Sequence, residues 1–193
     1  MTCGAILTGG HARRFAGRDK SQLLVDGRTI LARQLDALRP CVDRIHVIGR
    51  DNASGHDGVE FTPDVIAGRG PLGGLDTALS IPDVTRVLLL ACDLPNITTE
   101  LCAHLVGLAD GVDAVVPRTE RGYHPVCAVY ARSARATVRR HLETGALRML
   151  DLLADLRVRT VDADELARFG RPHVLLANIN THADLDALSS LSH

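Results

Sequence analysis

The chain has 193 residues, enough to bury a substantial core, and we expect one domain over residues 1–193. Apolar residues make up 46% of it and aromatic residues only 3%, so the core has to be aliphatic. A formal charge of −1 excludes bulk attraction to nucleic acid or to an anionic membrane. Anion binding must therefore come from a local arrangement of residues.

The cysteines and the apolar runs indicate the compartment. The five cysteines form no Cys-x-x-Cys pair, which favours reduced thiols over a disulfide framework or a zinc site. A strand pattern begins almost at Met1, and no apolar run approaches the roughly 18 residues of a membrane span. We therefore expect a cytoplasmic protein that contacts neither membrane nor nucleic acid.

Short apolar runs alternate with longer amphipathic ones along the chain. Strands are predicted at residues 3–8, 44–49, 59–64, 85–93, 112–117, 124–130, 157–162 and 171–179. Helices are predicted at residues 28–40, from about 72 onward, and at 98–111, 133–145, 148–156 and 180–191. This alternation predicts an α/β fold, a Rossmann-like three-layer α/β/α sandwich around a mostly parallel sheet. The run VLLLACD lacks polar alternation, which is typical of a central strand covered on both faces.

The stretch LTGGHARRFAGRDKS, residues 7–21, follows the first predicted strand. It is not a P-loop, because Asp19 precedes Lys20, and the adjacent Gly9 and Gly10 do not make a GxGxxG fingerprint. The glycines let backbone N–H groups approach a ligand, and the arginines and lysine that follow suit phosphate groups. Because parallel sheets bind ligands where their strands end, we predict a triphosphate-binding loop. The alternative is a solvated basic turn.

The same stretch resembles the signature of the MobA-like nucleotidyltransferases, Leu-x-Gly-Gly, then Ser-x-Arg-Met-Gly, then Asp-Lys. It is most similar to the molybdenum cofactor guanylyltransferases. The resemblance implies that the turn holds the nucleotide while an arginine and a lysine grip its phosphates. The matching positions are Leu7, Thr8, Gly9, Gly10, Arg14 and Lys20. The chain departs from the signature at Ala12 and at Phe15-Ala16-Gly17, which leaves the phosphate-binding side chains in place.

A second motif, LLLACDLP, places Asp93 at the end of a buried strand, at the edge of the sheet where the triphosphate-binding loop is also expected. Mg²⁺ takes one or two carboxylates together with water and phosphate oxygens, so an aspartate here is suited to hold it. From the residues alone, a turn or helix cap explains Asp93 equally well. In the resembled family the Cys-Asp-x-Pro step carries the Mg²⁺-binding aspartate, which implies that Asp93 is the metal ligand.

Glycines crowd the stretch GRGPLGGLDTAL, which is expected to be an irregular loop before a helix starting near Leu72. Such a loop presents backbone groups to a nucleobase edge, or it only closes the start of a helix. The resemblance implies nucleotide contacts from this loop, at Gly70, Pro71, Leu72 and Gly73. Because GPLGG and the Gly9-Gly10 turn resemble the guanylyltransferases of this family rather than its cytidylyltransferases, the resemblance implies guanine as the base. The resemblance also implies that Asp64 lies at the nucleotide, where the residues alone indicate a turn.

The acceptor side is assigned by the resemblance alone. Its His-Pro step matches His124 in RGYHPVCAVY, and a basic position in the same region matches Arg148. The closing LANINTHADL implies that Asn178 and Asn180 line the site, with Asn180 nearer the metal or phosphate. A lone histidine is more often structural, so His124 has that alternative.

The motifs follow the family order from Leu7 to about Leu185. They imply a Mg²⁺-dependent enzyme that transfers GMP from GTP to molybdenum-molybdopterin and releases pyrophosphate, with Arg14, Lys20 and Asp93 as catalytic residues. They also imply transient contact with a molybdenum insertion enzyme and with molybdoenzymes. Three alternatives remain. One is a molybdopterin cytidylyltransferase or sugar-phosphate nucleotidyltransferase, another a non-catalytic guanine-nucleotide-binding module, and the third an α/β domain with a basic turn.

Overall fold

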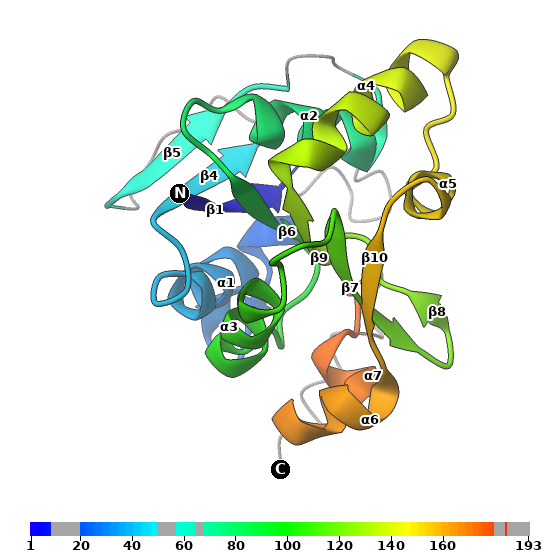
Figure 1. Cartoon of the computed structure of the whole chain (residues 1–193). Coiled ribbons are helices and arrows are strands. Elements are labelled where there is room, and N and C mark those ends of the chain that lie inside the picture. The colour runs from blue at the N-terminus through cyan, green and yellow to red at the C-terminus, as the bar shows by residue number, and fades with distance from the viewer. Residues whose placement is uncertain (9–19, 50–56, 65–67, 180–183, 185–193) are drawn as a thin grey trace.

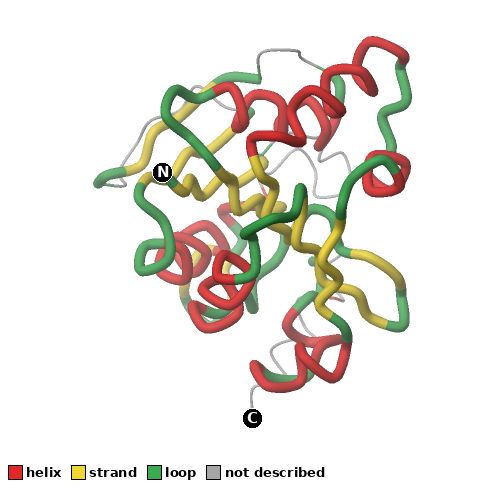
Figure 2. The backbone as a smooth tube through the Cα atoms, in the orientation of Figure 1, coloured by secondary structure: helices red, strands yellow, loops and turns green. Residues whose placement is uncertain are grey.

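The computed structural model of the chain describes residues 1–8, 20–49, 57–64, 68–179 and 184. The predicted helix at 180–191 lies outside the described residues apart from Asp184, as do Gly9, Gly10, Arg14 and Asn180. In the described part, helices pack on both faces of a central sheet (Figures 1 and 2). The predicted three-layer α/β arrangement is confirmed.

The strands of the described residues form an eight-stranded sheet in the order β10-β7-β9-β6-β1-β4-β5, with β8 paired to β7. Their bounds are β1 (Thr2–Leu7), β4 (Arg44–Ile48), β5 (Val59–Thr62), β6 (Arg86–Ala91), β7 (Ala114–Thr119), β8 (Gly122–Tyr123), β9 (Cys127–Ala131) and β10 (Val158–Val161). β9 runs antiparallel to β6 and β7, and β8 runs antiparallel to β7, whereas the other pairs are parallel. A small hairpin, β2 (Leu24–Val25) and β3 (Arg28–Thr29), was not predicted from the sequence.

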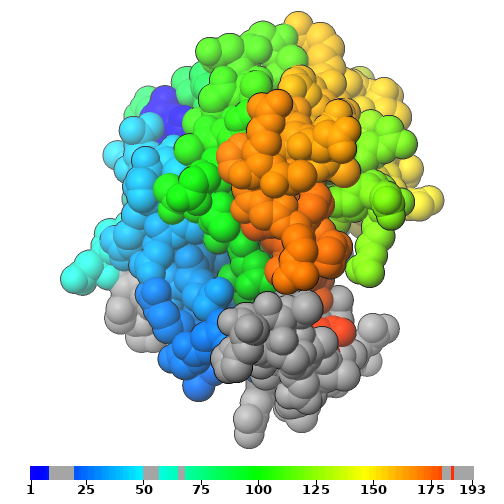
Figure 3. Space-filling view, turned by 90° about the horizontal axis from the view of Figure 1, so that it is seen from below, coloured from blue at the N-terminus to red at the C-terminus, as the bar shows by residue number. Residues whose placement is uncertain are grey.

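The helices divide between the two faces of the sheet. Their bounds are α1 (Ile30–Leu38), α2 (Gly70–Ser80), α3 (Thr99–Gly107), α4 (Arg135–Thr144), α5 (Met149–Ala154), α6 (Ala163–Leu166) and α7 (Pro172–Leu175). Helices α1, α3, α6 and α7 share one core with the sheet, and α2, α4 and α5 share the other. Seen from below in Figure 3, the orange surface of the C-terminal segment lies against the green surface of α3, where His104 contacts Glu165 at 2.7 Å.

The central strand β6 contributes to both cores. Leu88 and Leu90 belong to the core under α1 and α3, and Val87 and Leu89 belong to the core under α2 and α4. All of these side chains are fully buried. The prediction of a central strand covered on both faces is confirmed.

Two predicted elements near the C-terminal half differ from the structure. The predicted strand at 171–179 is wrong, because Pro172–Leu175 is the short helix α7. Proline has no N–H for a sheet ladder but suits the first turn of a helix. The predicted helix at 98–111 starts on its Thr98 cap but ends at Gly107, four residues early, because the backbone turns at Leu108.

The glycine-rich stretch is also more regular than expected. Helix α2 begins at Gly70, so Gly73 and Gly74 lie inside a helix rather than in an irregular loop. The reason for Gly74 is packing, since a Cβ added there would lie 2.5 Å from Cδ2 of Leu7 in β1. Glycine at this position lets α2 approach the strand whose end carries the predicted nucleotide loop.

Replacing Gly74 with alanine is expected to lower the free energy of unfolding by about 1–3 kcal/mol, as overpacking typically does. The new methyl group overlaps the buried side chain of Leu7. The matched control is Gly107→Ala at the end of α3, where an added Cβ meets nothing within 4 Å. This substitution should stabilise the helix slightly, because alanine has a higher helix propensity than glycine. Denaturant unfolding measures both. Equal effects of the two substitutions would contradict the packing explanation.

Candidate functional site

Most of the predicted site residues that the structure describes lie where three central strands end. β1, β4 and β6 are parallel, so their carboxyl ends meet at one edge of the sheet. Thr8 N–H donates to Ile48 O at 2.9 Å, and Cys92 N–H donates to Leu7 O at 3.1 Å. The end of β1 is therefore hydrogen-bonded on one side to β4 and on the other side to the loop that carries Asp93.

Lys20 and Asp93 meet at this edge. Lys20 Nζ lies 3.6 Å from Asp93 Oδ2, and the two side chains are only 20% and 16% exposed. Lys20 lies in a short helical turn, Lys20–Gln22, just before the β2–β3 hairpin. It is the only lysine in the sequence, which otherwise uses arginine for every basic side chain except histidine. The structure thus joins the two motifs that the sequence singled out most clearly.

The carboxylate of Asp93 has an unusual environment. Burial raises its pKa above the ordinary value, and the ammonium group of Lys20 opposes that rise. Its Oδ1 is buried and has no hydrogen-bond partner among the described residues. A buried acceptor without a donor is costly unless a proton, a ligand or a cation compensates it. Asp93 therefore fits a divalent cation.

Protein ligands for such a cation are few. The described residues contain no group of three or more His, Cys, Asp or Glu side chains arranged to hold a metal. Mg²⁺ commonly takes one or two carboxylates and completes its shell with water and substrate phosphates. A cation held by Asp93 would have room in its coordination shell for the phosphates of a nucleotide.

The C-terminal motif that contains Asn178 also lies beside the Asp93 loop. Ile179 N–H donates to Asp93 O at 2.9 Å, so the Asn178–Ile179 segment lies beside the Asp93 loop. Ile179 is fully buried, whereas Asn178 is exposed. Asn180, the other predicted residue of this motif, lies outside the described residues.

The start of α2 presents backbone groups rather than side chains. Gly70 and Pro71 are exposed, whereas Leu72 and Gly73 are buried, so the predicted nucleotide contacts of the latter two stay a prediction. The cap residue Arg69 makes no side-chain hydrogen bond to the helix N-terminus. A helix N-terminus favours anions. Asp64 follows β5, whose parallel strand ends at the same edge, and burial raises its pKa.

His124 lies at the same edge, one step across the sheet. Ala91 N–H donates to Val126 O at 2.8 Å, which ties the segment around His124 to the end of β6. The ring Nε2 lies 2.9 Å from Thr119 Oγ1. Burial lowers the pKa of His124, and the charge of Arg121 lowers it further, so the neutral imidazole is favoured at neutral pH.

Arg148 is placed differently. It is exposed at the N-terminal cap of α5, and no hydrogen bond or ion pair among the described residues joins it to Lys20 or Asp93. Its predicted acceptor contact stays a prediction.

Gln34, which lies beside the Asp93 loop, was not predicted from the sequence to belong to this site. Gln34 in α1 is 1% exposed, and its Nε2 donates to Ala91 O at 2.7 Å and to Leu94 O at 3.1 Å. The sequence did contain a signal, because Gln34 occupies the apolar face between Leu31 and Leu38. A polar side chain at helical spacing among core residues requires a partner.

The chain is similar to known proteins over most of its length. The family model for the MobA-like NTP transferase domain matches residues 4–160. The molybdenum cofactor guanylyltransferase of Desulfosudis oleivorans is 32% identical over 95% of this chain and 92% of its own length. The crystal structure of molybdopterin-guanine dinucleotide biosynthesis protein A from Archaeoglobus fulgidus has a TM-score of 0.83 and 27% identity over 98% of each chain.

A more distant neighbour shares the fold alone. The structure of 2-C-methyl-D-erythritol 4-phosphate cytidylyltransferase from Thermus thermophilus has a TM-score of 0.69 at 17% identity over 97% of each chain. The fold therefore does not by itself select the base.

None of the helices in the described ranges is long and apolar enough to cross a lipid bilayer.

Proposed function

The chain belongs to the MobA-like NTP transferase domain family, and from that premise we propose that it transfers GMP from GTP to molybdenum-molybdopterin, releasing pyrophosphate. The observation that carries the proposal is the Lys20–Asp93 pair at the strand ends, with a buried acceptor oxygen left for a cation. The names of the relatives supply the substrates, GTP and molybdopterin, and the site supplies the phosphate chemistry.

The reaction needs little acid–base chemistry from the protein. The terminal phosphate of the pterin is already anionic, so it attacks the α-phosphorus of GTP without a dedicated general base. Catalysis then rests on positioning and on neutralisation of charge. Lys20 and Arg14 neutralise the pyrophosphate leaving group, and the N-terminus of α2 binds a phosphate or the nucleotide.

We assign Asp93 as the Mg²⁺ ligand, and a bound Mg²⁺ neutralises phosphate charge and orients the reacting groups. Lys20 favours the ionised form of this carboxylate, because its positive charge opposes the rise in pKa that burial causes. In this proposal the neutral ring of His124 lies on the acceptor side of the same edge, with Arg148, Asn178 and Asn180 as further acceptor-binding residues.

The assignment of the base rests on GPLGG and on the glycine turn after β1, and on the guanine named for the relatives. Calorimetric titration with GTP, CTP, ATP and UTP, each with Mg²⁺, tests it. We expect selective GTP binding. Preference for CTP would keep the enzyme class and overturn the base, and absence of binding to any nucleotide would contradict the proposed function.

A pyrophosphate-release assay with GTP and the molybdenum cofactor then separates the enzyme from a binding module. The enzyme releases pyrophosphate only when the pterin acceptor is present, whereas a non-catalytic guanine-nucleotide sensor binds GTP and releases none. Because the acceptor is unstable, we also propose transient contacts with a molybdenum insertion enzyme and with molybdoenzymes in the cytoplasm.

A further inference from the structure

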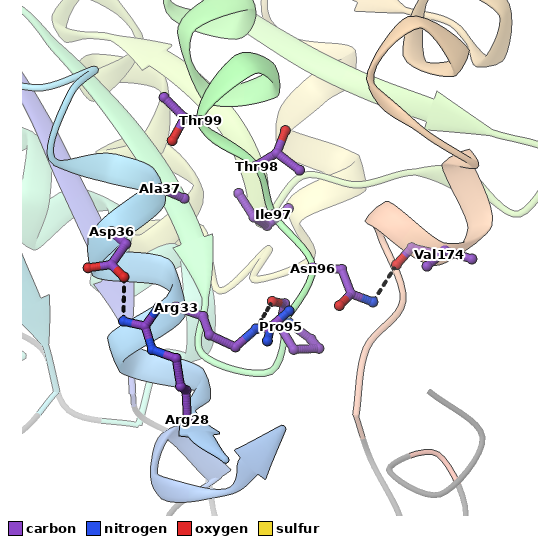
Figure 4. Close-up of a pocket in the computed structure, with 10 residues that line it drawn as sticks. All are labelled: Arg28, Arg33, Asp36, Ala37, Pro95, Asn96, Ile97, Thr98, Thr99 and Val174. Carbon is purple, nitrogen blue, oxygen red and sulfur yellow. Dashed lines mark hydrogen bonds and ion pairs between the residues drawn. The ribbon is translucent and has the colours of Figure 1, made fainter. Parts of the chain in front are cut away.

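The loop that carries Asp93 is held by side chains of α1. Nε2 of Gln34 bridges Ala91 O and Leu94 O, the carbonyl groups on either side of the Cys92–Asp93 step. At the next residue of the loop, Arg33 Nε donates to Pro95 O at 2.9 Å, as Figure 4 shows. Two consecutive residues of one helix therefore bind three carbonyl groups of this loop.

The opposite side of the loop is held by backbone bonds. Cys92 N–H donates to Leu7 O at 3.1 Å, and Ile179 N–H donates to Asp93 O at 2.9 Å. The loop is thus fixed to β1, to the C-terminal segment and to α1. The attachment from α1 is made by side chains that lie outside the loop, so a substitution in α1 can remove it without changing the loop itself.

Stability alone does not explain a glutamine at position 34. Its NH₂ end has to face the two carbonyl groups, because an amide oxygen placed there would repel both. In this orientation Oε1 of Gln34 is buried and has no hydrogen-bond partner among the described residues. An apolar side chain would fill the same core position without leaving that acceptor unpaired. What glutamine adds is a bridge across the Asp93 step.

We propose that Gln34 is a positioning residue for the divalent cation: by joining Ala91 O to Leu94 O, it fixes the loop from which Asp93 presents its buried Oδ1. The inference rests on the proposed role of Asp93 as the metal ligand. Gln34 itself touches neither the nucleotide nor the cation. Supporting residues of this kind typically change metal affinity 10–100-fold when they are replaced.

The test measures how much a divalent cation strengthens nucleotide binding. GTP affinity is determined by calorimetry with and without Mn²⁺, for the wild-type chain and for Gln34→Met, which has similar length but no donor. We expect Gln34→Met to reduce the Mn²⁺-dependent gain in GTP affinity about tenfold. The affinity for metal-free GTP should stay unchanged, because Gln34 does not contact the nucleotide.

The chain offers a matched control at the other end of β6. Arg132 Nη1 donates to Ile81 O and Val84 O, both at 3.0 Å, in the turn that precedes the strand. Arg132→Met therefore removes the same number of side-chain bonds to carbonyl groups, far along β6 from Asp93. Thermal unfolding of both variants measures their loss of stability, and only Gln34→Met is expected to change the Mn²⁺-dependent gain.

The outcomes separate the two proposals. If Mn²⁺ does not strengthen GTP binding to the wild-type chain, the proposed function of Asp93 fails, and the inference about Gln34 fails with it. If the wild-type gain is present and Gln34→Met retains it, only the inference about Gln34 is overturned. An equal loss in Arg132→Met also overturns it, because the effect then reflects stability.

A milder variant covers the case in which Gln34→Met does not fold. Gln34→Asn keeps the amide but is one methylene shorter, so it cannot span both carbonyl groups. A partial loss of the Mn²⁺-dependent gain supports the inference, and an unchanged gain contradicts it.

Discussion

Replacing Asp93 with asparagine is expected to lower turnover at saturating GTP and fixed Mg²⁺ by about a hundredfold or more. The substitution keeps the size of the side chain but removes the charge that we propose binds the cation. The Mg²⁺ concentration for half-maximal turnover should rise at the same time. Pyrophosphate release over a Mg²⁺ titration measures both, and an unaltered titration would exclude Asp93 as a metal ligand.

The same variant is expected to be more stable than the wild-type chain, although its turnover is lower. The pKa of Asp93 is raised in the folded chain, mainly by burial, so the fold binds its proton more tightly than the unfolded chain does. The free energy of unfolding therefore falls as pH rises from the ordinary aspartate pKa through the pKa of the folded state. At neutral pH the buried charge destabilises the fold. In metal-free buffer, Asp93→Asn should raise the unfolding temperature.

Asp113 supplies a control of opposite sign. Hydrogen bonds from Arg157 and Ser133 hold its pKa well below the ordinary value, although it is also an aspartate near a strand end. Its stabilising contribution is present above the unfolded pKa and is lost as pH falls. Asp113→Asn should accordingly lower the unfolding temperature at neutral pH, with no change in the Mg²⁺ titration. If both variants shift stability in the same direction, the burial argument for Asp93 fails.

Replacing Lys20 with alanine is expected to lower turnover about 100- to 1000-fold and to weaken GTP binding, while the chain still folds. The ammonium group is lost both from its proposed place at the phosphates and from the vicinity of Asp93, 3.6 Å away. Without it, the pKa of Asp93 rises further, so the activity that remains should disappear at a higher pH on the acid side. Unchanged turnover in Lys20→Ala would remove Lys20 from the mechanism.

The sequence provides an independent check on Lys20 that needs no substitution. Because Lys20 is the only lysine among these 193 residues, an amine-specific reagent applied to a chain of this sequence can modify just two groups, this side chain and the amino group of Met1. Met1 N lies near Thr85 Oγ1, in the turn at the amino end of β6. GTP with Mg²⁺ should protect Lys20 but not Met1 from modification, as mass spectrometry of the labelled protein would reveal. Equal labelling of both amines with and without nucleotide would place Lys20 outside the site.

Much of this architecture follows from local patterns. The alternation of apolar strands with amphipathic helices, the caps at Thr98 and Gly145, and the position of Asp93 after a buried strand are all readable along the chain. Each depends on residues within one or two turns of one another, where side-chain periodicity and backbone preference act directly. The resemblance of residues 7–21 to a nucleotidyltransferase signature has the same local character.

Other features depend on contacts between distant segments. The antiparallel β9 lies between β6 and β7, Gly74 meets Leu7, and α7 replaces a predicted strand. In each case a local signal was ambiguous, since an apolar run or a glycine is compatible with more than one conformation. Packing against another element then selects one of them.

The sequence by itself determined the fold class, the family signature and the two groups, Lys20 and Asp93, on which the proposed chemistry depends, because these are properties of short segments and of side-chain types. Only the tertiary structure decided that Lys20 and Asp93 meet, that Asp93 keeps a buried oxygen for a cation, and that Gln34 holds its loop. Burial, the pKa of a carboxylate and the reach of an amide are set by neighbours from other parts of the chain, and these neighbours exist only once the sheet and its helices have assembled.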